Sequence, residues 1–410
     1  MRGLRSSAGL VALLVALPAL ALWLFPRGSA RGLDRLLLES ALLQTHRSRP
    51  ADPPPSIWRE RLGSQAAPLW SARQQFWWQL WSSHASAGAV LVLETPASAP
   101  LPAHAFRLDE FTLVAPNPLV RQQLEQQLQL QRPALRGLER RCALQLQRGD
   151  AVYWSAAGLS SLLGPLAPLA SSLQQGCLTL SSERSRLLWS GEAAAARGSH
   201  AAAPRSAGTP RPEPFVTTEL LDLKGPRLDL LFRGLLSSAS VKQALADRYG
   251  LQPDALKRLS QSPFVLRLSA LDQGAFLAGL QLQLRLQDGQ SFWAPRLKAL
   301  EQPLIDQGLA LSRGTEKQWL WSRGGVAQGG WRWLSKEHLL LFLGPAPAPL
   351  KPAAFEHDGA WTLRLQPKRL LAKRLLPPLM PLAVRRAREL VLRGVPSRGG
   401  QTALSGELRP

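Results

Sequence analysis

The chain has 410 residues, which is long enough for two domains of ordinary size. Lys and Arg together number 50 against 28 Asp and Glu, so the formal net charge is +22. The scarcity of acids favours anionic partners. The two cysteines of the chain do not by themselves supply the four ligands of a structural zinc site.

The N-terminal segment predicts a membrane anchor. Residues 8–25 contain no charged side chain, and about 20 apolar residues are needed to cross a bilayer as a helix. A cleaved signal peptide is the alternative, because Gly28, Ser29 and Ala30 are small. We favour an uncleaved anchor over residues 1–30, since the apolar run is long and Arg27 lies within the cleavage region. In both cases the rest of the chain is expected to be exported, although the flanking charges do not choose an orientation.

Cys142 and Cys177 are the only cysteines. In an oxidising compartment they could form one disulfide bond. Two buried free thiols are the alternative.

The first half of the chain predicts a mixture of helices and strands. Residues 31–46 carry a broad leucine side, and residues 58–81 place Trp70, Trp77 and Trp81 at helical spacing, so both segments are predicted as helices. The remaining expected elements are strands at 88–94, 111–114, 142–147 and 151–154, a helix at 118–131, and a hairpin of 177–180 with 186–190.

A linker rich in Ala, Gly, Ser and Pro is predicted at residues 192–214. It divides a first αβ unit, 31–191, from a second, 215–410. In the second unit we expect strands at 227–236, 264–271, 277–287, 319–323, 330–334 and 339–343, and helices at 241–261 and 292–306. Residues 280–286 alternate Leu with polar residues, which predicts a sheet with one face in water. The predicted fold class is therefore α+β, with two similar αβ units of mainly antiparallel sheet and one N-terminal transmembrane helix.

Two proline-punctuated apolar blocks support an internal duplication. One contains Pro165 and Pro168, and the other contains Pro378 and Pro381. An alternating run precedes each block, at residues 143–147 and 362–366. A Ser-Gly-Glu segment follows each block, at residues 190–192 and 405–407. The shared order of these features predicts a duplicated supersecondary unit.

The chain resembles an uncharacterised family of cyanobacterial proteins with one membrane anchor and a large, repeated α/β body. The resemblance rests on the anchor, on the strand-then-helix phrase of residues 111–120 with the glutamine-rich 122–127, and on residues 264–300. It implies an architecture and a compartment, periplasmic or thylakoid-lumenal, but no activity.

Sequence motifs for catalysis are absent. The six histidines show no ligand spacing with one another or with cysteine, and no nucleophile elbow, phosphate-binding loop or dinucleotide fingerprint occurs. Glu337-His338 and Glu356-His357 could act as acid/base pairs, but solvated surface pairs explain them better. We therefore predict no catalytic residue, no cofactor and no metal ligand.

A basic run between Arg364 and Arg398 is the most informative functional signal. Leucines at helical intervals separate its cations, which is typical of an amphipathic segment on an anionic bilayer. The predicted contact residues are Lys368, Arg369, Lys373, Arg374, Arg385, Arg386 and Arg388. An anionic lipid or an acidic protein is the expected partner, and nucleic acid is disfavoured because the chain is expected to be exported.

The sequence therefore predicts a non-catalytic binding or assembly factor at a membrane surface. The alternatives are an envelope hydrolase whose site forms only in the fold, and a cytoplasm-facing protein that contacts nucleic acid.

Overall fold

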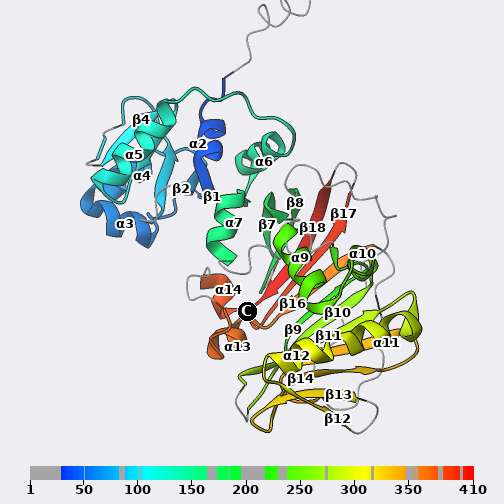
Figure 1. Cartoon of the computed structure of the whole chain (residues 1–410). Helices are drawn as coiled ribbons and strands as arrows, with labels where there is room; N and C mark the ends of the chain where they lie inside the picture. The colour runs from blue at the N-terminus through cyan, green and yellow to red at the C-terminus, as the bar shows by residue number, and fades with distance from the viewer. Residues whose placement is uncertain are drawn as a thin grey trace, which may run out of the picture. The chain divides into compact units, whose positions relative to one another are not determined.

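The computed structural model describes residues 29–410 except for 50, 83–87, 100, 103, 164–172, 184, 195–217, 230–237, 273–275, 315–317, 348–354, 356–358, 377–381 and 398–399. The chain is α+β with a large antiparallel sheet (Figure 1). It divides into two compact units. Unit 1 is Met1–Ser40 with Arg47–Leu144, and unit 2 is Ala41–His46 with Gln145–Pro410.

No helix within the described residues is long and apolar enough to cross a membrane. The predicted anchor at 8–25, both proline blocks and most of the predicted linker lie outside the described residues. The membrane anchor and the division at 192–214 therefore stay predictions.

The predicted helix over residues 31–46 is wrong in its second half. Helix α2 (Leu33–Glu39) ends where strand β1 (Ser40–Arg47) begins. Leu33, Leu36 and Leu37 are buried at helical spacing, whereas β1 has the alternating burial of a strand. The leucine content alone does not show this change of period.

The predicted helix over residues 58–81 is also replaced by shorter elements. The segment forms α3 (Ser56–Leu62), a 3₁₀ turn (Gly63–Gln65), α4 (Ala66–Ser71) and strand β2 (Phe76–Ser82). Trp58, Trp70 and Trp77 still meet, with ring centroids 5.8 to 6.0 Å apart. Trp77 lies on the aromatic strand β2, where pairing with β3 outweighs the helical spacing.

The sheet of unit 1 contains two strands that the sequence predicted and one, β4 (Ala105–Leu108), that it did not. The sheet has the order β2–β3–β5–β4 and is antiparallel, with β3 (Val90–Glu94) and β5 (Phe111–Val114). The predicted strands at 88–94 and 111–114 are confirmed. Helix α5 (Pro118–Gln129) begins at Asn117, whose side chain accepts a hydrogen bond from the Val120 N–H.

The predicted strand at 142–147 is wrong, because these residues lie in helix α6 (Gly137–Arg148). Leu138, Cys142 and Leu146 are buried at four-residue intervals, a helical period that outweighs the short alternation of 143–147. The run at 362–366 is instead mainly strand β16, so these two parts of the proposed repeat are not equivalent.

Unit 2 is built on one long antiparallel sheet with the order β1–β6–β7–β8–β18–β17–β16–β9–β10–β11–β15–β14–β13–β12 (Figure 1). Its strands are β6 (Ala151–Trp154), β7 (Gln175–Glu183), β8 (Arg186–Ala194), β9 (Glu219–Gly225), β10 (Phe264–Ala270), β11 (Ala278–Arg285), β12 (Ala310–Arg313), β13 (Gln318–Arg323), β14 (Val326–Trp333), β15 (His338–Leu343), β16 (Trp361–Leu365), β17 (Glu389–Pro396) and β18 (Gln401–Arg409). Its helices are α7 (Ala156–Leu163), α9 (Ala239–Tyr249), α10 (Pro253–Ser260), α11 (Gly289–Ala299), α12 (Glu301–Asp306), α13 (Pro367–Ala372) and α14 (Leu382–Arg386). The predicted hairpin and the strands at 264–271, 277–287, 319–323, 330–334 and 339–343 are confirmed, whereas residues 227–229 are not a strand.

One face of this sheet forms the core of unit 2. Phe264, Trp331 and Trp361 point to it from different strands, and Trp293 and Leu297 of α11 pack against them. The alternation of residues 280–286 places its leucines on this apolar face. The sequence predicted that the opposite, polar face would lie in water. This is wrong for part of that face, because Gln283 on β11 is only 1% exposed.

Two Ser-Gly-Glu segments meet at the centre of the sheet. In the β8–β18 pair, Ser190 lies directly opposite Ser405. The strands on either side have the mirrored order β6–β7–β8 and β18–β17–β16. A Cβ on Gly191 would lie 2.0 Å from the carbonyl oxygen of Cys177, and one on Gly406 would lie 2.1 Å from that of Val391. Each glycine is therefore required by a close approach of the neighbouring strand.

Replacing Gly191 with Ala should lower the free energy of unfolding by about 1 to 3 kcal/mol, because the new methyl group meets backbone that cannot move aside. Chemical denaturation followed by circular dichroism measures the change. Gly149→Ala is the matched control, since nothing lies within 4 Å of that position, and it should be neutral or slightly stabilising. Equal stability of both variants would contradict the close approach.

Candidate anionic-surface site

The basic run of residues 364–398 does not form the single amphipathic helix suggested by its leucine spacing. It contains the end of β16, the short helices α13 and α14, and strand β17. Pro367 begins α13, and Arg374 adopts a positive φ of 57° just after this helix ends. The cations of the run are consequently divided between different environments.

Arg364 is part of the fold rather than of a surface. Its side chain is 9% exposed, and its guanidinium donates to Glu389 Oε1 at 2.8 Å. Arg409 on β18 donates to the other oxygen of Glu389 at 2.9 Å. One carboxylate thus holds two arginines from the strands on either side of it.

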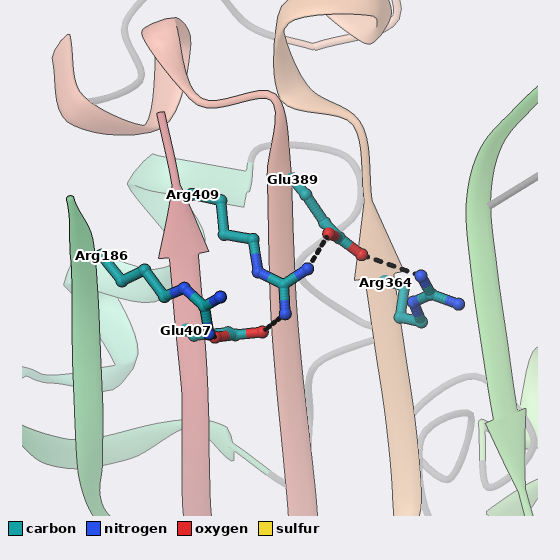
Figure 2. Close-up of polar contacts among 5 residues, drawn as sticks. All are labelled: Arg186, Arg364, Glu389, Glu407 and Arg409. Atoms are coloured by element: carbon teal, nitrogen blue, oxygen red, sulfur yellow. Dashed lines mark hydrogen bonds and ion pairs between the residues drawn. The ribbon is translucent and has the colours of Figure 1, made fainter. Parts of the chain in front are cut away.

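This ion-pair network continues across the polar face of the sheet. Figure 2 shows Arg364, Glu389, Arg409, Glu407 and Arg186 side by side on β16, β17, β18 and β8. Arg409 also donates to Glu407, whose carboxylate lies 3.5 Å from Arg186. Charges of opposite sign therefore alternate across four neighbouring strands, an arrangement that stabilises their register.

Two of the predicted contact residues, Lys373 and Arg369, form hydrogen bonds within the protein. Lys373 Nζ donates to the Leu271 carbonyl at 3.1 Å and lies 3.2 Å from Asp272. Arg369 donates to the side chain of Gln366 at 3.1 Å. Both side chains are half-buried, so their role is mainly to hold α13 against its surroundings.

The remaining predicted residues form the basic cluster, which we define as Lys368, Arg374, Arg385, Arg386 and Arg388. All five are exposed, and none forms an ion pair with a residue that the structure describes. The Lys368 N–H donates to the Ala387 carbonyl at 3.2 Å, which brings the start of α13 beside the end of α14. The start of α13 and the residues between α14 and β17, which include Arg388, are therefore neighbours.

The electrostatics of the basic cluster favour an anionic partner. Like charges at short range repel, and no acid of the described residues offsets these five. Of the described acids, Glu389, which follows Arg388 in the chain, pairs with Arg364 and Arg409, and Asp272 lies 3.2 Å from Lys373. A negatively charged surface would supply the missing counter-charge.

The Glu337-His338 pair is not arranged for acid/base work. Glu337 lies 3.5 Å from Arg285 in an ion pair, and both side chains line a small pocket with Pro263 and Gln287. Burial, and then the positive charge of Arg285, lower the pKa of His338 below its ordinary value. The acid is thus directed to an arginine rather than to the imidazole.

Ser335 is the one hydroxyl that meets this imidazole in the described part of the chain. Its Oγ lies 2.7 Å from Nδ1 of His338 and accepts hydrogen bonds from the backbone N–H groups of residues 337 and 338. A nucleophilic hydroxyl needs a free lone pair on its oxygen, and both lone pairs of Ser335 Oγ accept hydrogen bonds from the backbone. The arrangement is a turn closed by a serine side chain.

Within the described ranges, no group of three or more His, Cys, Asp or Glu side chains could hold a metal ion. The second predicted pair, Glu356-His357, lies outside those ranges.

Both cysteines of the chain are disulfide-bonded, and both are fully buried. The sequence left free thiols open as an alternative, and the structure contains none. Cysteines oxidised in this way are typical of proteins that reside outside the cytosol.

Comparison with known proteins gives no relative from which a role could be transferred: no protein-family model, no curated protein and no solved structure matches the chain.

Proposed function

We propose that the protein is a non-catalytic, membrane-anchored binding or assembly factor whose body docks on an anionic membrane surface. The observation that carries this proposal is the basic cluster: five exposed cations in α13, in α14 and just outside α13 and β17, without ion pairs to described residues. Each cation near an anionic bilayer contributes about 1 kcal/mol before screening, so several together give measurable affinity.

We propose that the body lies outside the cytoplasm. The apolar segment at 8–25 supports export, and the disulfide-bonded Cys142 and Cys177 support an oxidising compartment. The periplasm and the thylakoid lumen both meet this condition. Nucleic acid is a poor partner for a body in either place.

We also infer that the central sheet arose by duplication. The direct pairing of Ser190 with Ser405 and the matching close approaches at Gly191 and Gly406 support two similar units related by a local two-fold axis. Each of the two parts has a strand, then helix, then a two-stranded hairpin: β6, α7, β7 and β8 in the first, and β16, the two short helices α13 and α14, β17 and β18 in the second.

The test of anionic-surface docking uses the full chain carried in phosphatidylcholine nanodiscs and mixed with vesicles. The wild type should float with phosphatidylglycerol vesicles but not with phosphatidylcholine vesicles, and binding should fade at high salt. The variant Arg385→Gln, Arg386→Gln, Arg388→Gln should bind about tenfold to a hundredfold more weakly, because it loses three surface cations.

The matched control removes three exposed cations from the helices on the apolar side of the sheet: Lys242→Gln, Lys257→Gln, Lys298→Gln. Both triple variants lose the same net charge, so a difference between them locates the site. Equal binding by the two variants would mean that only net charge matters and would overturn the proposal. Stronger binding to duplex DNA than to anionic vesicles would instead favour a nucleic-acid partner.

A further inference from the structure

Large apolar side chains are exposed at one edge of the unit 2 sheet. Leu277 is 59% exposed, Leu343 53% and Val326 47%. Leu277 precedes β11, Leu343 ends β15 and Val326 begins β14. We call these three residues the apolar rim. Exposed leucines and valines of this kind indicate a contact surface when they lie together.

Backbone contacts show that the apolar rim is continuous. Leu343 lies opposite Leu280 on β11 and opposite Gly329 on β14. The Gly344 N–H donates to the Gln328 carbonyl at 2.8 Å, which joins the end of β15 to the strand that begins at Val326. The three side chains therefore occupy successive strand ends along a single edge.

The same edge leads directly to the basic cluster. The Leu271 N–H donates to the Leu277 carbonyl at 3.2 Å, and the Leu271 carbonyl accepts from Lys373 Nζ at 3.1 Å. Arg374 of the basic cluster follows Lys373 in the chain. In Figure 1, α13 and α14 lie beside the strand ends of this sheet, next to the C-terminus. Lys373 and its neighbour Arg374 therefore lie at the Leu277 end of the rim, where Lys373 also pairs with Asp272. At the other end of the rim, Arg323 of β13 lies opposite Val326.

We propose that this edge is the part of the protein that enters the membrane: the apolar rim inserts into the headgroup region of an anionic bilayer while the basic cluster contacts lipid phosphates. The inference rests on the proposed docking function. It adds how deeply the protein enters the bilayer and which edge of the sheet faces it. The strands then meet the membrane end-on.

A bilayer fits this edge better than a second protein does. The rim residues lie at strand ends beside cations, so the surface combines apolar side chains with positive charge. The headgroup region offers water and phosphate to the cations and hydrocarbon to the apolar side chains. Adjacent uncompensated cations match the charge of anionic lipid but would be costly in an apolar protein contact.

The test places a polarity-sensitive nitrobenzoxadiazole probe on the full chain at Val326→Cys. Because both native cysteines are disulfide-bonded, the introduced thiol is the only one that reacts. On addition of phosphatidylglycerol vesicles to the nanodisc-borne protein, the probe emission should shift to the blue and should be quenched by lipids with a shallow spin label. The matched control is Gln261→Cys. This exposed residue lies just before β10, at the end of the strands that is far from the rim, so neither the blue shift nor the quenching should occur there.

A second variant measures the contribution of the rim to affinity. Leu277→Ser with Val326→Ser should weaken flotation about fivefold, and the binding that remains should become more sensitive to salt, because the charges alone then carry it. Leu119→Ser with Leu130→Ser removes similar exposed apolar side chains from unit 1 and should leave binding unchanged. Thermal melts that match the wild type would show that both double variants fold.

The two levels of the proposal fail differently. If the protein floats with anionic vesicles but the probe at position 326 reports only water, the rim does not insert and the further inference is overturned while docking stands. If the Arg385, Arg386 and Arg388 variant floats as well as the wild type, the docking function fails first.

Discussion

Replacing Glu389 with Ala should lower the free energy of unfolding by about 3 kcal/mol. Glu389 is the carboxylate between Arg364 and Arg409, and its own side chain is only 15% exposed. Removing one partner of a buried pair leaves uncompensated charge, which typically costs about 3 to 5 kcal/mol. Arg409 is 36% exposed and can recover solvation, so the expected value lies near the lower limit.

Urea denaturation of the full chain measures this effect. The control is Glu125→Ala, which removes the acid of an exposed pair with Arg121 on α5. That pair should contribute less than about 0.5 kcal/mol. A loss at Glu389 no larger than the loss at Glu125 would show that the ion-pair network of Figure 2 does not hold the strands together.

Period-two alternation made β11 and several other strands of unit 2 predictable, whereas β9 and β12 were not predicted. Residues 280–286 alternate Leu with polar residues, and β11 places those leucines on the apolar face. The burial of Gln283 was not predictable in the same way, because the alternation of one strand does not reveal what covers its polar face. Burial depends on residues that are distant in sequence.

The errors in unit 1 and in α6 arise where two periods compete. Trp70 and Trp77 are seven residues apart, a spacing compatible with two helical turns, yet a chain reversal between α4 and β2 brings them together equally well. Over residues 142–147 the short alternation suggests a strand, whereas the longer spacing of Leu138, Cys142 and Leu146 indicates the helix that forms. Longer windows were the better guide.

The basic run illustrates what sequence can and cannot show about a site. The exposed cations Arg385, Arg386 and Arg388 were identifiable from composition alone. The burial of Arg364 was not, because its partner Glu389 is 25 residues away and the next members of the network lie on β18 and β8. Glu389 is the only acid between residues 364 and 398, a signal that could have marked it, but the sequence does not show which cations it pairs with. The apolar rim gave no sequence signal, since it forms from three separate strand ends.

Replacing both Cys142 and Cys177 with Ser should lower the free energy of unfolding by about 3 to 4 kcal/mol. The two residues enclose 34 others, and a cross-link over such a length restricts the unfolded chain by this amount in the chain-entropy model. Both side chains are fully buried, so two unpaired hydroxyls would add a desolvation cost to the lost cross-link.

Thermal melts with and without a reducing agent measure the effect. The wild type should melt at a lower temperature once it is reduced, and the double Ser variant should melt at the same temperature in both conditions. Val90→Ser is the control for a buried polar substitution that leaves both cysteines in place. It should lower the melting temperature relative to the wild type by the same amount with and without reductant. A wild type that is indifferent to reductant would contradict the bond and would also remove the main structural support for a body outside the cytoplasm. If the wild type melts at a lower temperature once it is reduced, the folded protein is most stable in an oxidising compartment. This is the kind of compartment to which the N-terminal segment is proposed to direct it.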